Sequence, residues 1–433
     1  MGLPGGWRRI SLAELGAWFG GGTPSKGRPE FWEHGTVPWL SPKDMGPDLI
    51  RATQDHITEA AVAGSSVRRV PGGAVVFVVR SGILERTLPI AVVPFEVTLN
   101  QDMKALVPHP NVDARWIAWG LRSREQELLR ECRKSGTTVA SIDTKALMAQ
   151  ELPVPPLDQQ RRIVEVLEDR LSRLDAADAG LVTALERLVS LRESVIQTEL
   201  TGRRGLAGRA TTLDLADAGV DDGFIPAMPP GWRWKRLHEV ADVVGGVTKD
   251  GKRQSDATSV ELPYLRVANV QRGRFDLSAV TSIIVPQATA DRLRLLPGDV
   301  LLNEGGDRDK LGRGWVWEGQ LEPCIHQNHV FRARVRDSQL DPYLLSWAAN
   351  SFGGRWCERN GRQSVNLASI SLSKIRMMPI PVPPVEEQEA IAKRIGGVMD
   401  ASLTLKRDVA LAMQHGALLR RALLGAAFSG RLG

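Results

Sequence analysis

The nine residues Leu152-Pro-Val-Pro-Pro-Leu-Asp-Gln-Gln160 occur again, nearly unchanged, as Ile380-Pro-Val-Pro-Pro-Val-Glu-Glu-Gln388. In each copy a pair of prolines ends the preceding segment, and an acidic residue follows where the N-terminus of a helix favours negative charge. Each copy therefore marks a junction between a folded segment and a long helix. The duplication predicts that the chain consists of two related halves.

Further matches on both sides of these junctions lie in the same order along the chain. Gly6-Trp7-Arg8 recurs as Gly231-Trp232-Arg233, Trp119 recurs as Trp347, and Thr201-Gly-Arg203 resembles Ser429-Gly-Arg431. The shift between matching positions grows only from 225 to 228, so few residues were inserted. A repeat of roughly 200 residues is much longer than a solenoid module, so each copy should have its own core.

The segments after the two junctions carry apolar residues at intervals of seven, which is typical of coiled-coil helices. The first stripe comprises Leu167, Leu174, Leu181, Leu188 and Val195, and the second comprises Ile391, Val398, Leu405, Ala412 and Leu419. A helix of about 40 residues is roughly 60 Å long, more than its neighbouring domain can cover. We therefore expect the two stripes to pack against each other.

The segment before each junction has a different pattern of residues. Short β-like runs such as 75–79 and 88–93 alternate with glycine and proline, which predicts a mixed α/β domain. The expected boundaries are a domain at 1–154, a helix at 155–203, a linker at 204–228, a second domain at 229–380 and a second helix at 381–433. The predicted fold class is α+β with an internal repeat.

Composition limits the classes of protein that the chain can belong to. The 433 residues carry a net charge of +6, 42% of them are hydrophobic, and only three are cysteines, which indicates a folded, reduced, cytoplasmic protein. The apolar runs are too short for a signal peptide or a membrane span. The predicted domains carry charges of +2 and +6, whereas the predicted helices carry −2 and +2, so a bound polyanion would contact the domains.

Together these motifs resemble the specificity subunits of type I restriction-modification systems, the HsdS family. The resemblance rests on the openings Leu3-Pro-Gly-Gly-Trp7 and Pro229-Pro-Gly-Trp232, the two proline junctions, the two helix ends and the segment 302–314. It implies two target recognition domains that read the halves of a split double-stranded DNA target. It also implies that the two helices pack antiparallel as a spacer, which gives a pseudo-two-fold arrangement.

The resemblance also implies partners and the absence of catalysis in this chain. Two modification subunits and restriction or translocase subunits are expected to dock on it, with S-adenosylmethionine, ATP and Mg²⁺ bound by those partners and no cofactor here. Two alternatives remain, a methyltransferase fused to its DNA reader and a coiled-coil adaptor without DNA binding. The sequence lacks the glycine-rich cofactor motif between a strand and a helix that a methyltransferase would need. The positive charge of the predicted domains disfavours an adaptor that does not bind DNA.

Residues that contact DNA are expected among cationic and amide side chains of the two domains, because these groups bind phosphates and base edges. The candidates are Lys43, Arg80, Arg86, Gln101 and Lys104 in the first half, and Arg266, Asn269, Arg272, Arg274, Arg308, Lys310, Arg313 and Gln327 in the second. The glycine-bounded loop 305–314 is the strongest single segment. It lacks the Gly-Lys-Ser/Thr ending of an ATP-binding loop.

Cys324, His326 and His329 lie close together in the sequence and carry side chains that can bind a metal ion. The matching residues of the first copy, Thr98, Asn100 and Met103, include no metal-binding side chain of this kind. We therefore expect no metal at this position. No catalytic residue is predicted anywhere in the chain.

Overall fold

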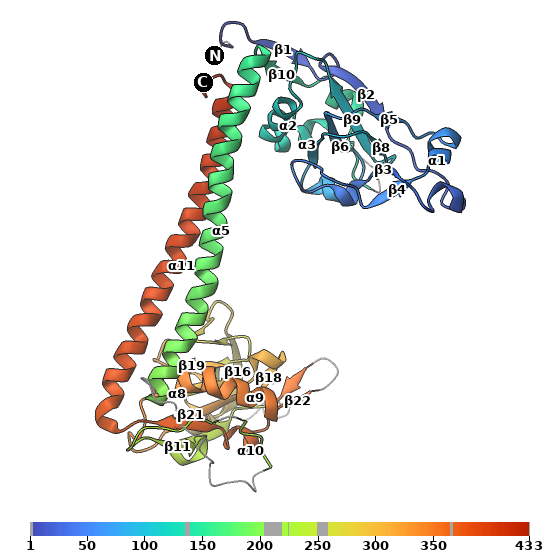
Figure 1. Ribbon diagram of the computed structural model, residues 1–433. Coiled ribbons are helices and arrows are strands. Elements are labelled where there is room, and N and C mark those ends of the chain that lie inside the picture. The colour runs from blue at the N-terminus through green and yellow to red at the C-terminus, as the bar shows by residue number, and fades with distance from the viewer. Residues whose placement is uncertain are drawn as a thin grey trace. The chain divides into compact units, whose positions relative to one another are not determined.

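The computed structural model describes residues 3–134, 139–202, 219–223, 225–248, 259–363 and 367–432 (Figure 1). The chain divides into two compact units, Met1–Val182 with Ala410–Gly433, and Thr183–Val409. Arg203 and most of the predicted linker lie outside the described residues. Within the described ranges, none of the helices has the length and apolar character needed to cross a membrane.

The first unit contains a mixed α/β head followed by the start of a long helix. Its strands are β1 (Arg8–Ser11), β2 (Gly16–Gly20), β3 (Val37–Leu40), β4 (Asp55–Ile57), β5 (Arg69–Val70), β6 (Ala74–Val78), β7 (Ile90–Val93), β8 (Val97–Leu99), β9 (Met103–Pro108) and β10 (Glu151–Val154). Its helices are η1 (Pro29–Phe31), η2 (Pro42–Asp44), α1 (Glu59–Gly64), η3 (Gly82–Glu85), α2 (Ala114–Ser123), α3 (Glu125–Cys132), α4 (Thr144–Met148) and α5 (Leu157–Thr201).

The core of the first head lies around the sheet with strand order β2-β9-β6-β7. Every residue of the apolar strand β6 is buried, which fits a central strand covered on both faces. A second sheet has the order β4-β3-β8-β5. Strand β1 pairs with β10 in antiparallel register, Arg8 opposite Val154, so the first strand of the head lies beside the one that leads into α5.

The second unit also contains a mixed α/β head. Its strands are β11 (Arg233–Arg236), β12 (Ala241–Gly245), β13 (Ser259–Leu265), β14 (Val270–Gln271), β15 (Arg274–Phe275), β16 (Thr281–Pro286), β17 (Val300–Asn303), β18 (Gly305–Gly306), β19 (Gly314–Val316), β20 (Ile325–His326), β21 (Val330–Val335), β22 (Arg362–Gln363), β23 (Ala368–Ser369) and β24 (Pro379–Val382). Its helices are α6 (Leu237–Val240), α7 (Gln287–Leu293), η6 (Arg308–Lys310), α8 (Pro342–Ala348), the π-helical turn η7 (Ala349–Gly353), α9 (Gly354–Asn360), α10 (Leu372–Ile375) and α11 (Val385–Phe428).

The main sheet of the second head has the order β12-β21-β17-β19, the same sequence of connections as β2-β9-β6-β7 in the first. Strand β11 pairs with β24, Arg233 opposite Val382, just as β1 pairs with β10. The hairpin β14–β15 and the small sheet β18-β23-β22 lie beside the glycine-bounded loop.

The start of each long helix is bound to its head by one glutamine, the last residue of the duplicated motif. Gln160 is buried, its Oε1 accepts a hydrogen bond from the backbone N–H of Asp113 at 2.8 Å, and its Nε2 donates to two backbone carbonyl groups. Gln388 makes the same set of bonds, with the N–H of Asp341 again at 2.8 Å. Asp113 and Asp341 are the N-caps of α2 and α8, so the motif fixes a helix of the head to the long helix.

In the first unit, the beginning of α5 packs against the end of α11. Ile163, Leu167 and Leu171 lie in one apolar cluster with Leu423 and Ala427. Further along α5, the carboxylates of Asp175 and Asp178 bind the guanidinium of Arg420 at 2.6 and 2.8 Å. Because higher numbers on α5 meet lower numbers on α11, the helices are antiparallel within this unit.

The predicted stripe of α5 follows its least exposed side. Leu167 is buried, Leu174, Leu181 and Leu188 are half-buried between exposed neighbours, and Val195 is half-buried beside buried Ile196. In the second unit, the end of α5 contributes Ile196 and Leu200 to the cluster that contains Ile391 and Ile395 of α11.

The predicted stripe of α11 is wrong in its second part. Ile391 is buried and Val398 half-buried, but Leu405 is 44% exposed and Leu419 53% exposed. The buried positions spaced by seven are Ile395, Ser402, Val409 and Gly416. A search for large apolar residues misses Ser402 and Gly416, although small residues allow two helices to approach closely. A Cβ atom at Gly416 would lie 3.3 Å from a carboxylate oxygen of Asp178.

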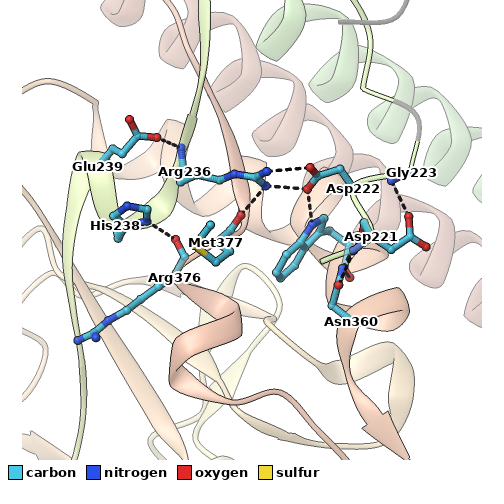
Figure 2. A network of polar contacts seen from close by, with 10 residues as sticks. Asp221, Asp222, Gly223, Arg236, His238, Glu239, Asn360, Arg376 and Met377 are labelled. Carbon is cyan, nitrogen blue, oxygen red and sulfur yellow. Dashed lines mark hydrogen bonds and ion pairs between the residues drawn. The ribbon is translucent and has the colours of Figure 1, made fainter. Parts of the chain in front are cut away.

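The end of the segment predicted as a linker is bound to the second head (Figure 2). The guanidinium of Arg236 is fully buried and binds both carboxylate oxygens of Asp222 at 2.6 and 2.8 Å. Trp356 donates its indole N–H to the same carboxylate at 2.9 Å. The side chain of Asn360 accepts from the backbone N–H of Asp221 and donates to the carbonyl oxygen of that residue. Residues 221 and 222 therefore belong to the packing of the second unit.

Candidate nucleic-acid interface

The basic loop of the second head is held in place by hydrogen bonds to backbone carbonyl groups. Arg308 lies in η6 and donates to the carbonyl oxygen of Glu358 from Nε at 3.3 Å and from Nη2 at 3.0 Å. Arg272, in the β14–β15 turn, donates from Nη2 to the carbonyl oxygen of Asp309 at 3.0 Å and from Nη1 to that of Asn350. The structure therefore brings the hairpin and the 305–314 loop together.

These contacts gather several predicted cations on one part of the second head, the basic cluster Arg272, Arg274, Arg308, Lys310 and Arg313. Arg272, Arg274 and Arg308 are exposed, and Lys310 forms an ion pair with Asp307. Burial, and then the positive charge of Arg272, lower the pKa of Arg313. The cluster can attract a polyanion, because cations held close together repel one another until an anion binds.

Asn269 is a correction to the predicted contacts. It is 3% exposed, its Nδ2 donates to the carbonyl oxygens of Asp276 and Ala279 at 2.9 and 3.2 Å, and its Oδ1 accepts from the N–H of Arg266. The amide is thus fully used in shaping the turn and cannot read a base edge. Arg266 and Gln327 are half-buried, and the backbone N–H of Gln327 donates to the carbonyl oxygen of Leu265.

The candidates of the first head lie in turns at strand ends, except Lys104. Lys43 lies in η2 and pairs with Asp55 at 2.6 Å, and this hydrogen bond and charge raise the pKa of Lys43. Arg80 follows β6 and lies 4.0 Å from Asp102, and exposed Arg86 follows η3. Gln101 accepts a hydrogen bond from the hydroxyl of Thr23 in the turn before β9.

Lys104 is half-buried in β9, where it lies opposite Gly20 of β2. A Cβ atom at Gly20 would lie 2.8 Å from Nζ of Lys104. Arg80, Gln101 and Lys104 thus lie around one turn, whereas Lys43 lies in η2 and Arg86 follows η3. The first head shows fewer cations in contact than the second, in line with its lower net charge.

Comparison with known proteins identifies the first part of the chain. Residues 4–186 match the family model described as the type I restriction modification DNA specificity domain. This part of the chain is similar to that domain family. The resemblance predicted from the sequence is therefore confirmed.

One relative of the specificity domain is the specificity subunit of the type I restriction enzyme EcoR124I/EcoR124II from Escherichia coli. It is 45% identical over 183 residues, which are 42% of this chain and 44% of the relative. The chain thus matches less than half of the length of this relative.

Two solved structures share the fold over the whole chain. The HsdS subunit from Thermoanaerobacter tengcongensis has 19% identity and a TM-score of 0.61, with 100% of this chain and 98% of that chain covered. A structure that describes complex assembly and conformational transition of the type I R-M system has 20% identity and a TM-score of 0.72, with both chains fully covered. The predicted mixture of helices and strands is confirmed by this likeness.

Cys324, His326 and His329 have separate environments. Burial lowers the pKa of His326 to about 4, and its Nδ1 lies 2.6 Å from the carbonyl oxygen of Val330. His329 instead pairs with Glu304 at 2.7 Å. Burial raises the pKa of Cys324 to about 12, so its thiol stays protonated at neutral pH.

Two residues near the basic cluster were missed by sequence reasoning. Asn350 accepts a hydrogen bond from the N–H of Gly314 at 3.1 Å and donates to the carbonyl oxygen of that residue at 2.8 Å, which closes the end of the loop. Exposed Arg362 lies in β22, which pairs with β23 beside β18. Neither residue can be recognised from the sequence, because only the folded chain brings it to the loop. Asn350 reaches the loop through its hydrogen bonds to Gly314, and Arg362 through the pairing of β22 with β23.

Proposed function

We propose that this chain is the specificity subunit of a type I restriction-modification complex, which reads a bipartite double-stranded DNA target and catalyses no reaction itself. The match of residues 4–186 to the specificity domain carries the proposal. The second head supports it, because it has the same order of strands in its main sheet and a basic cluster on exposed loops.

The decisive experiment combines the purified chain with its modification subunit and a library of DNA duplexes. We expect adenine or cytosine methylation at one bipartite sequence that requires both proteins. Methyl transfer by the chain alone would support a methyltransferase fused to its reader. Assembly without any DNA binding would support the adaptor alternative.

We further propose that the two halves form a pseudo-two-fold repeat in which α5 and α11 pair as an antiparallel coiled coil that sets the distance between half-sites. The equivalent bonds of Gln160 and Gln388 support the repeat. At 1.5 Å per residue, the 45 residues of α5 extend about 68 Å, roughly two turns of B-DNA. Insertion of seven residues near Ala176 should change the spacer length of the methylated sequence and leave both half-sites unchanged.

The proposed partners are two modification subunits and restriction or translocase subunits, which carry S-adenosylmethionine, ATP and Mg²⁺. Large apolar side chains are exposed on the long helices, among them Val182, Val189, Leu411, Leu418 and Leu419. A helix with an exposed apolar face is suited to packing against a partner helix.

The double variant Leu411→Glu/Leu418→Glu tests this interface. We expect it to lose co-purification with the co-expressed modification subunit and to retain its circular dichroism spectrum. Leu296→Glu, at a comparably exposed leucine of the second head, is the matched control and should assemble normally. Normal assembly of the double variant would place the modification subunit elsewhere.

A further inference from the structure

Glu168 of α5 joins the first head to its long helix. Its Oε1 accepts a hydrogen bond from the indole N–H of Trp119 at 3.1 Å, and its Oε2 lies 3.2 Å from Nη1 of Arg115. Both partners lie on α2. One carboxylate therefore holds α2 on α5 through a hydrogen bond and an ion pair, beyond the contact already made by Gln160.

The equivalent positions in the second unit follow from the N-caps and the glutamines. Trp119 lies six residues after the N-cap Asp113, and Trp347 lies six residues after the N-cap Asp341. Glu168 lies eight residues after Gln160, and the residue eight positions after Gln388 is Gly396. Because both glutamines bind their N-caps in the same way, Gly396 is the residue of α11 that corresponds to Glu168, as Trp347 of α8 corresponds to Trp119.

The described residues of the second unit form neither of the two contacts. Trp347 is 6% exposed, and its Nε1 is buried without a hydrogen-bond partner in the described part of the chain. Tyr343, at the position that corresponds to Arg115, donates its hydroxyl hydrogen to Glu318 instead. A Cβ atom at Gly396 or at Gly397 would meet nothing within 4 Å, so space for a side chain is present.

This difference changes how readily each head separates from its helix. A buried N–H without a partner is unfavourable, and a local opening that lets water reach it removes that penalty. Two glycines also give α11 more backbone freedom here than α5 has. The turn after α8 is π-helical, a geometry that is common where helices deform.

We propose that Glu168 is a positioning residue that locks the first head onto α5, and that the second head, which lacks this lock, pivots on α11 at Gly396-Gly397. One consequence rests on the proposed function: the first half-site is read by a fixed head, and the second half-site is read by a head that adjusts to the DNA.

Reciprocal exchange of the two residues tests the proposal, with amide hydrogen exchange of the full chain as the readout. Glu168→Gly should speed exchange in α2 by roughly ten- to a hundredfold, the effect of losing a hydrogen bond to a charged group. Gly396→Glu should slow exchange in α8, because the new carboxylate can accept from Trp347. Gly396→Ala is the control, since it restores helix propensity without adding an acceptor.

A tryptophan pair gives a second measurement that leaves both helices intact. Trp119→Phe should speed exchange in α2, because it removes a satisfied donor, whereas Trp347→Phe should leave exchange in α8 unchanged or slower, because it removes an unsatisfied one. Equal effects of the two substitutions, or a Gly396→Glu variant that behaves like Gly396→Ala, would overturn the proposal. None of these measurements needs DNA, so a failure of the proposed function would be seen separately, as an absence of DNA binding.

Discussion

The strongest prediction concerns Asp222, the carboxylate that neutralises the buried guanidinium of Arg236. Replacement by asparagine keeps the shape of the side chain and removes its charge. Arg236 keeps its hydrogen bond to the carbonyl oxygen of Met377 at 2.8 Å but loses its charged partner (Figure 2). The variant therefore leaves a cation buried without a counter-ion.

The size of the effect follows from the burial of the pair. Removal of one partner of a buried ion pair destabilises a protein by about 3–5 kcal/mol. Asp222 is 24% exposed, and the asparagine oxygen can still accept from Trp356. We therefore expect a loss of about 2–3 kcal/mol from the second unit. Asp221→Asn is the matched control, because this neighbouring carboxylate is exposed, and it should change stability by less than about 0.5 kcal/mol.

Native-state hydrogen exchange is the suitable assay, because a chain of two units need not unfold in one step. Amides of β11 and α9 should exchange roughly thirty- to a hundredfold faster in Asp222→Asn at neutral pH, while amides of β6 in the first unit serve as an internal reference. Equal exchange in the Asp222 and Asp221 variants would refute the stabilising role of the pair.

The effect of Asp222 should also depend on pH. Burial raises the pKa of Asp222, but hydrogen bonds from Arg236 and Trp356 and the charge of Arg236 outweigh it, so the pKa is below its ordinary value. A lowered pKa in the folded state gives a stabilisation that is complete above the unfolded value of about 3.9 and is lost as the pH falls through the folded value. The difference between the original chain and Asp222→Asn should therefore shrink only in acid.

Three further predictions concern other parts of the chain. Arg274→Ala should weaken binding to DNA duplexes of any sequence and reduce the slope of log affinity against log salt by about 1, as measured by fluorescence anisotropy; an unchanged slope would place Arg274 away from phosphates. Because burial lowers the pKa of His326 to about 4, the second unit should lose stability as the pH falls from about 6.5 toward 4, and His326→Asn should abolish that dependence in chemical denaturation. Phe77→Ala, at a fully buried position of β6, should destabilise the first unit by about 3–5 kcal/mol and leave exchange in β17 unchanged.

The sequence predicted those features that repeat or depend on local chemistry. The duplicated motif located the starts of α5 at Leu157 and of α11 at Val385, because proline and acidic residues act on the helix start through their neighbours. The 305–314 loop was recognised from its glycines and cations. Its anchors were not, because Asn350 and Glu358 reach it only through the folded chain.

The incorrect predictions have a common physical cause. Asn269 has the side chain expected of a residue that reads adenine, but the same amide can hold a turn, and only burial distinguishes the two roles. The end of the predicted linker looked unstructured because Asp221 and Asp222 are polar. Asn360, the partner of Asp221, is remote in sequence, and Arg236, the partner of Asp222, is buried within a strand. Composition alone therefore does not indicate either contact.

The outward stripe of α11 shows why apolar spacing identifies a helix but not the surface that it packs against. Leu405 and Leu419 are spaced for a coiled coil, yet the buried positions of α11 include Ser402 and Gly416 instead. A close contact favours small residues on the inner face, and Arg420 adds ion pairs to Asp175 and Asp178 at its edge. The large apolar residues are then left for a different partner. A long helix with small residues inside and leucines outside is consistent with two interfaces, one within the chain and one with another protein.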